Sequence, residues 1–482
     1  MTAIDRLTGE FIDAVHPALF SYLSGAYRMG HLFIEIEGQS ISPYIEELFL
    51  ECDSTQEELV RQFQELITSQ SKSDYFHLEG SRLFLMRAYS VQESIAQHLD
   101  RIRLAKPRLQ IDLDKAEKAI LLESLELEQK NAIMHALKEP IAAIWGGPGT
   151  GKTYTAARFL KTLLSGVEHK VRVMLCAPTG KAVSAIARSI QTGIGAGFEA
   201  KTLHSLLQIR PLSHKTDGRD FLPYDLFIVD ESSMIDAALF QKFICRVASG
   251  AKIVFLGDPD QLAPVEPGAP FLDLVAHTTQ GRLIRCLRAE LAGLVHFSAL
   301  VRDGKVDEAI AFADASQGVD LHLVEEERLE DSVRMAMEEL SATVLSPLCV
   351  GPLGTDALNE QLKKRNCAPQ MPIIMLQNDH DLGLVNGQIG SLRDDMAYFE
   401  TPEGKRAIPR VLLGPFSPAF CLSVHKSQGS EFDEVLLVLP PGSERFGRKM
   451  LYTAITRAKK RVTILSTEAT FRACIEERAA TF

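Results

Sequence analysis

Short apolar runs alternate with stretches of helical apolar spacing through most of the chain. The runs expected to form buried strands occupy residues 141–145, 171–177, 226–229, 253–256, 344–347 and 434–438. After the first run, apolar residues recur at helical spacing from Ala156 to Leu164, and Gly166 offers a stop. Strands that alternate with helices predict an α/β fold built on parallel sheets.

The segment of residues 1–110 has a different pattern. Residues 11–23 suggest one amphipathic helix, residues 31–37 alternate like a half-exposed strand, and residues 75–86 suggest a hairpin. Ser90 to Glu93 has the composition of a capping box, which predicts that a helix begins there. Its apolar face is expected to hold Val91, Ile95, Leu99 and Ile102.

No acid, base or ligand cluster occurs in this small α+β unit, so packing or partner binding is the favoured role, with DNA contact as the alternative. The basic run Arg101, Arg103, Lys106 and Arg108 is expected to be a solvated linker. Two further segments interrupt the α/β pattern. Residues 208–224 suggest a short hairpin with an Asp217-Gly218 turn, and residues 365–420 contain short β-like runs that suggest a small inserted barrel.

Composition limits the class of protein without deciding the partner. The chain has 482 residues, 46% of them hydrophobic, which is enough for several packed domains. A net charge of −11 argues against a uniformly basic coat, but a narrow strand channel needs only local donors. The eight cysteines include no C-x-x-C pair, and no apolar run reaches the length of a membrane span. We therefore expect a cytoplasmic protein with reduced thiols and no membrane contact.

The clearest chemical motif is GGPGTGKT at residues 146–153, which fits G-x-x-x-x-G-K-[ST] between a strand and a helix. Backbone N–H groups of such a loop surround phosphate oxygens, Lys152 can reach the β and γ phosphates, and the Thr153 hydroxyl can bind Mg²⁺. ATP and Mg²⁺ are the expected cofactors. The residues expected to hold the nucleotide are Gly146, Gly147, Pro148, Gly149, Thr150, Gly151, Lys152 and Thr153.

Other polar residues follow the predicted strands or precede the phosphate loop. Asp230 is expected to hold the Mg²⁺ shell, and Glu231 to orient or deprotonate the attacking water. Gln261 is a plausible γ-phosphate sensor, and Gln129 offers the donor and acceptor that pair with an adenine edge. Arg457 is the kind of residue that a neighbouring domain supplies to transition-state charge.

Two loops at strand ends are candidates for contact with a nucleic-acid strand. Thr179 and Lys181 follow the second apolar run, and Thr202 and His204 lie in a similar setting. Hydroxyl, backbone and lysine groups there could hold phosphates. The alternative, that both loops only end strands, is about equally favoured from these residues alone.

The order of these motifs carries a family resemblance. The strings are EQ at 128–129, GGPGTGKT, APTGKA at 177–182, TLH at 202–204, VDESSMID at 229–236, GDPDQL at 257–262, VHKSQGSEFD at 424–433 and YTAITRAKK at 452–460. Over about residues 120–465 they resemble superfamily 1 DNA helicases. The wording of APTGKA, VDESSMID and VHKSQGSE is similar to the RecD family more than to the UvrD family.

The resemblance implies an architecture. It predicts two RecA-like P-loop motor domains at residues 111–282 and 283–482, an SH3-like barrel within the second, and an N-terminal domain that docks on a partner. It also implies that Gln129 contacts adenine, that Gln261, Arg288 and Arg457 complete the γ-phosphate shell, and that Thr179, Thr202 and His425 face single-stranded DNA. Arg285 is the alternative, but the spacing after Leu283 favours Arg288. The sequence departs from the family at Ser423 and at LAPV, residues 262–265.

The function that the resemblance implies is ATP-dependent 5′-to-3′ translocation on single-stranded DNA. The chain is expected to be the motor subunit of a helicase–nuclease complex with RecB-like and RecC-like subunits, which processes double-strand DNA ends for recombinational repair. No nuclease constellation is present, so cleavage is expected of a partner. The alternatives are a free-standing 5′-to-3′ helicase and a nucleotide-binding structural subunit.

Overall fold

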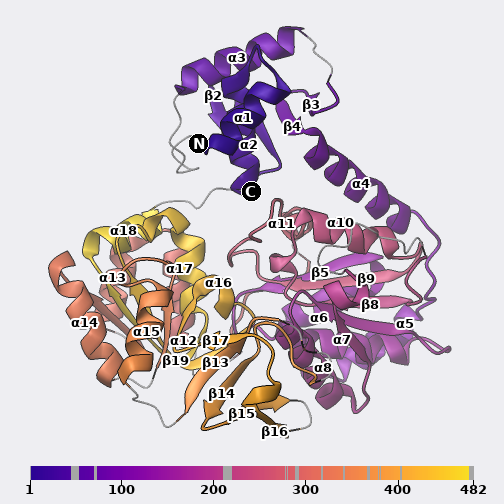
Figure 1. Cartoon of the computed structure of the whole chain (residues 1–482). Coiled ribbons are helices and arrows are strands. Elements are labelled where there is room, and N and C mark those ends of the chain that lie inside the picture. Colours follow the sequence, from indigo (N-terminus) through magenta and orange to yellow (C-terminus); the bar gives the residue numbers. More distant parts are fainter. Residues whose placement is uncertain are drawn as a thin grey trace.

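The computed structural model describes most of the chain and groups its strands into four sheets. It describes residues 2–44, 54–69, 73–209, 220–276, 278, 280–287, 292–315, 318–339, 342–365, 370–377, 379, 382–401 and 404–476. Each sheet has at least one apolar cluster of its own. Figure 1 shows a small N-terminal unit above two larger α/β domains, with one long helix running from it to the first of them.

The N-terminal unit is an α+β fold around an antiparallel sheet. Its helices are α1 (Ala3–Ile12), α2 (Pro17–Arg28) and α3 (Gln56–Ser69), and its strands, in sheet order, are β2 (Ser40–Ser42), β1 (Phe33–Glu37), β4 (Arg82–Leu85) and β3 (Phe76–Glu79). The predicted strand and hairpin are therefore confirmed.

Two helix predictions in this unit are wrong. The single helix expected over residues 11–23 is divided, because α1 ends at Asp13 in extended backbone and Pro17 supplies the first turn of α2. The helix expected to begin at Ser90 begins at Met86 instead and runs to Arg103 as α4. The Ser90 hydroxyl donates to the Met86 carbonyl inside that helix, so it caps nothing.

Helix α4 packs on the first α/β domain. Its Ile95 and Ile102 belong to the apolar cluster on one face of that domain's sheet. Arg101 donates to the carbonyls of Ile244 and Val247 at the end of α10 (Ala237–Arg246), satisfying groups that a helix end leaves unpaired. The prediction of a solvated linker is wrong for Arg101, and the boundary near residue 110 falls after a helix that already packs on the motor core.

The first α/β domain is a six-stranded parallel sheet. The strands, in sheet order, are β10 (Arg282–Leu283), β5 (Ile141–Gly146), β9 (Lys252–Gly257), β8 (Leu226–Val229), β6 (Val173–Ala177) and β7 (Glu199–Thr202). Its other helices are α5 (Leu113–Leu121), α6 (Leu127–Lys138), α7 (Lys152–Ser165), α8 (Gly180–Ile194), α9 (Leu203–Leu206) and α11 (Pro270–Ala276). The four strands predicted here are confirmed.

The predicted boundary at residues 282–283 is wrong. Strand β10 pairs with β5, and Leu283 is buried in the core of the first domain. The Leu287 N–H donates to the Gly149 carbonyl, so the segment up to residue 287 still packs on this domain. The hairpin predicted at residues 208–224 lies largely outside the described residues, which omit 210–219.

The second α/β domain is a five-stranded parallel sheet. The strands, in sheet order, are β11 (Val319–Leu323), β20 (Ala458–Ser466), β19 (Phe432–Leu439), β12 (Thr343–Ser346) and β18 (Cys421–Ser423). Its helices are α12 (Ala292–Arg302), α13 (Val306–Ala315), α14 (Glu326–Glu339), α15 (Thr355–Arg365), α16 (Val424–Ser427), α17 (Gly447–Ile455) and α18 (Glu468–Glu476). Both strands predicted for this half are confirmed.

An antiparallel sheet is inserted between α15 and β18. Its strands, in sheet order, are β16 (Gly404–Pro409), β15 (Met396–Thr401), β14 (Ile389–Arg393), β13 (Met371–Met375) and β17 (Phe416–Pro418). Within the described residues no ladder joins the edge strands β16 and β17, so the sheet is open where a barrel was predicted. None of the helices described is long and apolar enough to cross a membrane.

Candidate nucleotide site and interdomain cleft

The phosphate loop joins β5 to α7. Gly149 and Gly151 adopt positive φ angles of 71° and 79°, which favour glycine and turn the chain into the helix that begins at Lys152. The Lys152 ammonium donates to the carbonyls of Gly146 at 2.7 Å and Gly147 at 3.0 Å. The ammonium therefore lies over the loop at the N-terminal end of α7, where phosphate groups bind favourably.

Asp230 and Glu231 follow β8, two strands away from β5 in the same parallel sheet. Burial, and then the neighbouring Glu231 carboxylate, raise the pKa of Asp230 to about 7, while Lys152 opposes the shift. Glu231 adopts a left-handed backbone with φ of 50°, a strained conformation for a residue with a side chain. A desolvated carboxyl beside a lysine and a second acid fits a site that receives a divalent cation with phosphate.

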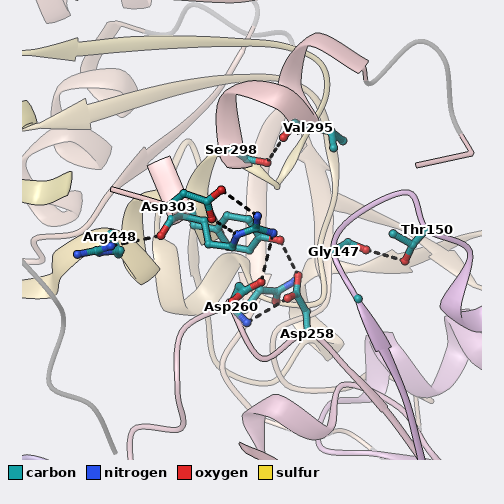
Figure 2. Close-up of polar contacts among 12 residues, drawn as sticks. Gly147, Thr150, Asp258, Asp260, Val295, Ser298, Asp303 and Arg448 are labelled. Atoms are coloured by element: carbon teal, nitrogen blue, oxygen red, sulfur yellow. Dashed lines mark hydrogen bonds and ion pairs between the residues drawn. The ribbon is translucent and has the colours of Figure 1, made fainter. Parts of the chain in front are cut away.

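The loop that follows β9 carries Gln261 and lies in the cleft between the two α/β domains. The Gln261 amide nitrogen donates to Asp258 Oδ2 at 3.2 Å. The Tyr452 hydroxyl of α17, in the second domain, donates to the same carboxylate oxygen at 3.0 Å. Figure 2 shows Asp258 and Asp260 of this loop in one view with Gly147 and Thr150 of the phosphate loop. The expected γ-phosphate sensor is thus bonded to a residue that the other domain holds.

Gln129 lies at the other side of the phosphate loop, in the first turn of α6. Its Oε1 accepts the Glu126 N–H at 3.2 Å, while its buried Nε2 has no partner within the described residues. A Cβ added at Gly151 would lie 3.1 Å from that nitrogen, so the free donor is next to the phosphate loop. A buried donor without a partner costs free energy, which fits the expected contact with an acceptor atom of adenine.

Of the two candidate arginines after β10, the structure describes Arg285. Arg285 forms an exposed ion pair with Glu126 at 2.9 Å. Leu287, which precedes Arg288 in the sequence, donates its backbone N–H to the Gly149 carbonyl of the phosphate loop. Arg288 itself lies outside the described residues, as do residues 289–291.

Arg457 is buried between α17 and β20. Its guanidinium donates to the Thr453 and Ser430 carbonyls at 3.1 and 3.3 Å and to the Thr456 hydroxyl at 3.4 Å. Among the residues that the structure describes, no carboxylate forms an ion pair with it. A buried cation held only by neutral groups is costly unless an anionic ligand balances it.

Three strands end in a hydroxyl that caps a helix. Thr179 accepts the Ala182 N–H after β6, Thr202 accepts the Ser205 N–H after β7, and Ser423 accepts the Lys426 N–H after β18. The Thr179 and Thr202 hydroxyls therefore have a structural role at the strand ends, in line with the alternative that these two loops only end strands. Capping leaves neighbouring N–H groups of each first turn available to a phosphate.

Lys181 does not lie on an open surface. Its ammonium donates to the Ser430 hydroxyl of the second domain at 2.6 Å. Burial, followed by the positive charges of Lys459 and Arg457, lowers the pKa of Lys181 to about 8. The adjacent Gly180 has room for no Cβ, because Val385, between β13 and β14 of the inserted segment, would lie 2.5 Å away. Lys181 therefore lies where the two α/β domains and the inserted segment meet.

The expected histidines occupy different settings. His204 is exposed on α9, whereas His425 on α16 is partly buried beside Phe446, and burial lowers its pKa. A neutral imidazole can still donate or accept a hydrogen bond.

The donor set fits Mg²⁺ bound with a nucleotide. The described residues contain no group of three or more His, Cys, Asp or Glu side chains that could hold a metal alone. A phosphate-bound Mg²⁺ needs only one or two protein oxygens, and Thr153 with Asp230 would supply them.

Sequence reasoning missed the cross-cleft contacts of the Gln261 loop. Asp258, Tyr452, Thr453 and Gln428 all take part, through bonds to each other or to Gln261 and Leu262. Each of these residues lies inside one of the motif strings at 257–262, 424–433 and 452–460. Membership of these motifs was the signal for a functional role, but which residues pair across the cleft depends on the tertiary fold.

Two family models match the part of the chain that contains the quoted motifs. A family model described as an AAA domain matches residues 124–323, and one described as a UvrD-like helicase C-terminal domain matches residues 418–465. A solved structure of Bacteroides Pif1 bound to single-stranded DNA is 16% identical, with a TM-score of 0.46, covering 72% of this chain and 94% of that one.

Curated relatives include proteins named as helicase subunits. The RecBCD enzyme subunit RecD of Mycolicibacterium smegmatis is 32% identical over 413 residues, which cover 73% of each chain. The RecD subunit of Haemophilus influenzae is 26% identical over 456 residues, covering 72% of this chain and 70% of that one. The ATP-dependent RecD2 DNA helicase of Deinococcus radiodurans is 30% identical over 369 residues, covering 70% and 48%. The chain belongs to the RecD family of superfamily 1 helicases and is an ATP-dependent DNA helicase.

Proposed function

We propose that this chain is a 5′-to-3′ translocase on single-stranded DNA and the motor subunit of a helicase–nuclease complex that processes double-strand DNA ends for recombinational repair. The proposal assigns it RecB-like and RecC-like partner subunits. The polarity is supported by membership of the family. The complex is supported by the relatives that are named as subunits of the RecBCD enzyme.

The motor assignment is supported by the placement of the proposed site residues on two domains that contact each other. The first domain supplies Lys152, Asp230 and Gln261, and the second supplies Arg457. In such a site hydrolysis depends on the closure of the cleft, so it can be coupled to a step along DNA.

The proposed roles follow from the chemistry of each group. Lys152 and Arg457 stabilise the phosphoryl charge, and Arg288 completes that shell. Thr153 and Asp230 hold Mg²⁺, which neutralises phosphate charge when bound. Glu231 orients or deprotonates the attacking water, and Gln129 contacts adenine.

The proposed DNA path crosses the capped strand ends of both domains. Thr179, Lys181, Thr202, His204 and His425 are assigned to it. Thr179 and Lys181 lie where the second domain touches the first, since a Cβ on Gly429 would lie 3.5 Å from the Thr179 hydroxyl. A change in the cleft would therefore alter the grip on the strand.

The N-terminal unit is proposed to dock on a partner subunit. Ile4, Leu7 and Phe11 share one face of α1 and are 72%, 66% and 70% exposed. The aromatic ring of Tyr75 extends this face, 5.2 Å from the ring of Phe11. A contiguous exposed apolar face on a folded unit is typical of a protein interface.

DNA-stimulated ATP hydrolysis tests the motor assignment. Lys152→Gln should abolish hydrolysis and keep the fold, because the clamp on phosphate charge is lost. Near-normal turnover in that variant would contradict the proposal. Hydrolysis that DNA does not stimulate would favour the alternative of a structural nucleotide-binding subunit.

Co-purification with co-expressed RecB-like and RecC-like subunits tests the docking role. Phe11→Glu should weaken assembly, whereas Leu121→Glu, at a similarly exposed apolar position on α5, should not. A truncated chain should begin at Met86 rather than near Ile111, because it then keeps α4 on the motor core. If the truncated chain assembles as well as the full chain, the docking role of the N-terminal unit is wrong. If the full chain itself fails to assemble with these subunits, the free-standing helicase becomes the better account.

A further inference from the structure

The loop after β9 is bonded to the second α/β domain at several points. Asp258 accepts from the Tyr452 hydroxyl, and the Leu262 N–H donates to the Thr453 hydroxyl at 2.8 Å. The Leu262 carbonyl accepts from Gln428 at 3.3 Å, and Leu262 itself is buried in the core cluster of the second domain. The loop that carries Gln261 is therefore fixed by the second domain on both sides of that residue.

Asp258 determines which end of the Gln261 amide remains free. Its carboxylate can only accept hydrogen bonds, and Oδ2 takes one from Gln261 Nε2 at 3.2 Å. The opposite atom, Oε1, is buried and has no hydrogen-bond partner among the residues described. A buried acceptor without a donor is costly, so this geometry favours a ligand that donates a hydrogen.

The Tyr452 hydroxyl connects this pair to the phosphate loop. A Cβ added at Gly147 would lie 3.1 Å from the hydroxyl oxygen, which places the hydroxyl directly against the loop. Burial, and then the charges of Asp258 and Asp260, raise the pKa of Tyr452 well above its usual value. The Tyr452 hydroxyl therefore keeps its proton near neutral pH and can donate to Asp258.

We propose that Tyr452 is a positioning residue for ATP hydrolysis: through Asp258 it fixes the Gln261 amide so that Oε1 can accept a hydrogen from the attacking water. Because Tyr452 belongs to the second domain, Gln261 is fixed only while the two domains are closed on each other. This inference rests on the proposed place of Gln261 in the ATP site.

The loss of the Tyr452 hydroxyl should lower the rate and leave nucleotide affinity almost unchanged. Asp258 would keep the Asp260 N–H, at 3.1 Å, and Gln261 as donors but lose the contact that holds it from the other domain. A small displacement of a water-orienting group costs on the order of 10- to 100-fold in rate. The residues proposed to hold the phosphates and adenine do not include Tyr452, so KM for ATP should change by less than about twofold.

A double-mutant cycle on the full chain tests this, with kcat and KM for DNA-stimulated ATP hydrolysis as readouts. The variants are Tyr452→Phe, Gln261→Ala and the double variant. Tyr224→Phe is the control, because it removes a tyrosine hydroxyl that donates to Glu199 at 2.7 Å away from the cleft. If Tyr452 acts through Gln261, Tyr452→Phe lowers kcat in the parent and has no further effect in the Gln261→Ala background.

Two results would overturn the inference. One is unchanged kcat in Tyr452→Phe, and the other is a loss that multiplies with that of Gln261→Ala, which would show that Tyr452 acts independently. A different result, full activity in Gln261→Ala, would remove Gln261 from the proposed ATP site itself. Asp258→Asn adds a second check, because its amide can donate to Oε1, reverse the Gln261 amide and lower kcat with KM retained.

Discussion

Replacement of Asp230 by asparagine should stabilise the nucleotide-free protein above neutral pH. The side chain is buried beside Glu231, and its pKa is raised from 3.8 to about 7. Asparagine cannot ionise, and its oxygen can keep the bond from the Glu231 N–H, at 2.8 Å in the parent. The variant therefore removes the cost of a desolvated negative charge.

The sign of the pH dependence follows from proton binding. Between about pH 4 and 7 the unfolded carboxyl is ionised while the folded one holds its proton, so the parent loses stability as pH rises. The rise of the Asp230 pKa from 3.8 to about 7 corresponds to a loss of at most about 4 kcal/mol in the free energy of unfolding. The asparagine also gives up the attraction of Lys152, so we expect a net gain of about 1–2 kcal/mol at pH 8.

Thermal melting without nucleotide or Mg²⁺, at pH 5, 6, 7 and 8, measures this. The advantage of Asp230→Asn over the parent should grow up to about pH 7 and then level, reaching a few degrees. Asp433→Asn is the control, because Lys460 lowers the pKa of that exposed carboxyl and no gain is expected. An advantage that does not change with pH, or a variant less stable than the parent at pH 8, would refute the desolvated carboxyl.

Three further predictions concern the buried arginine, the lysine between the domains and the helix α4. Arg457→Ala should bind nucleotide almost normally in a fluorescence titration but hydrolyse it at least about 100-fold more slowly, and loss of binding with unchanged turnover would contradict its role. Single-stranded DNA affinity at constant ionic strength should fall between pH 7 and 9, as Lys181 loses its charge near pH 8, and Lys181→Arg should show a flatter profile; equal slopes would argue against Lys181. Ile102→Ala should cost about 3 kcal/mol and make α4 accessible to proteases, whereas unchanged melting would show that α4 does not pack on α10.

The sequence predicted what local patterns determine. The phosphate loop and six strands of the two parallel sheets, β5, β6, β8, β9, β12 and β19, carry their signals within a few residues, and the structure has them where the pattern predicts. The other strands of these sheets were not predicted. The break between α1 and α2 was missed because the apolar helical spacing continues across Asp13 and Pro17, where the backbone leaves the helix and begins a new one.

Contacts between distant residues could not be predicted in the same way. Ile95 and Ile102 show a helical apolar face, but no periodicity tells whether that face packs on its own unit or on the next domain. Asp258 and Tyr452 are 194 residues apart, and their bond depends on how the two domains close. For the loops with Thr179 and Thr202, the alternative weighed beside DNA contact was that they only end strands. The capping of the next helix by each hydroxyl was not predicted.

Directional translocation by the full chain tests the central claim most directly. Streptavidin is bound to biotin at either the 3′ or the 5′ end of an oligonucleotide, and its ATP-dependent displacement is measured. A 5′-to-3′ motor with the proposed divided site should displace streptavidin from the 3′ end, and Lys152→Gln and Arg457→Ala should not. Displacement from the 5′ end, or displacement by Lys152→Gln at the rate of the parent, would contradict the account.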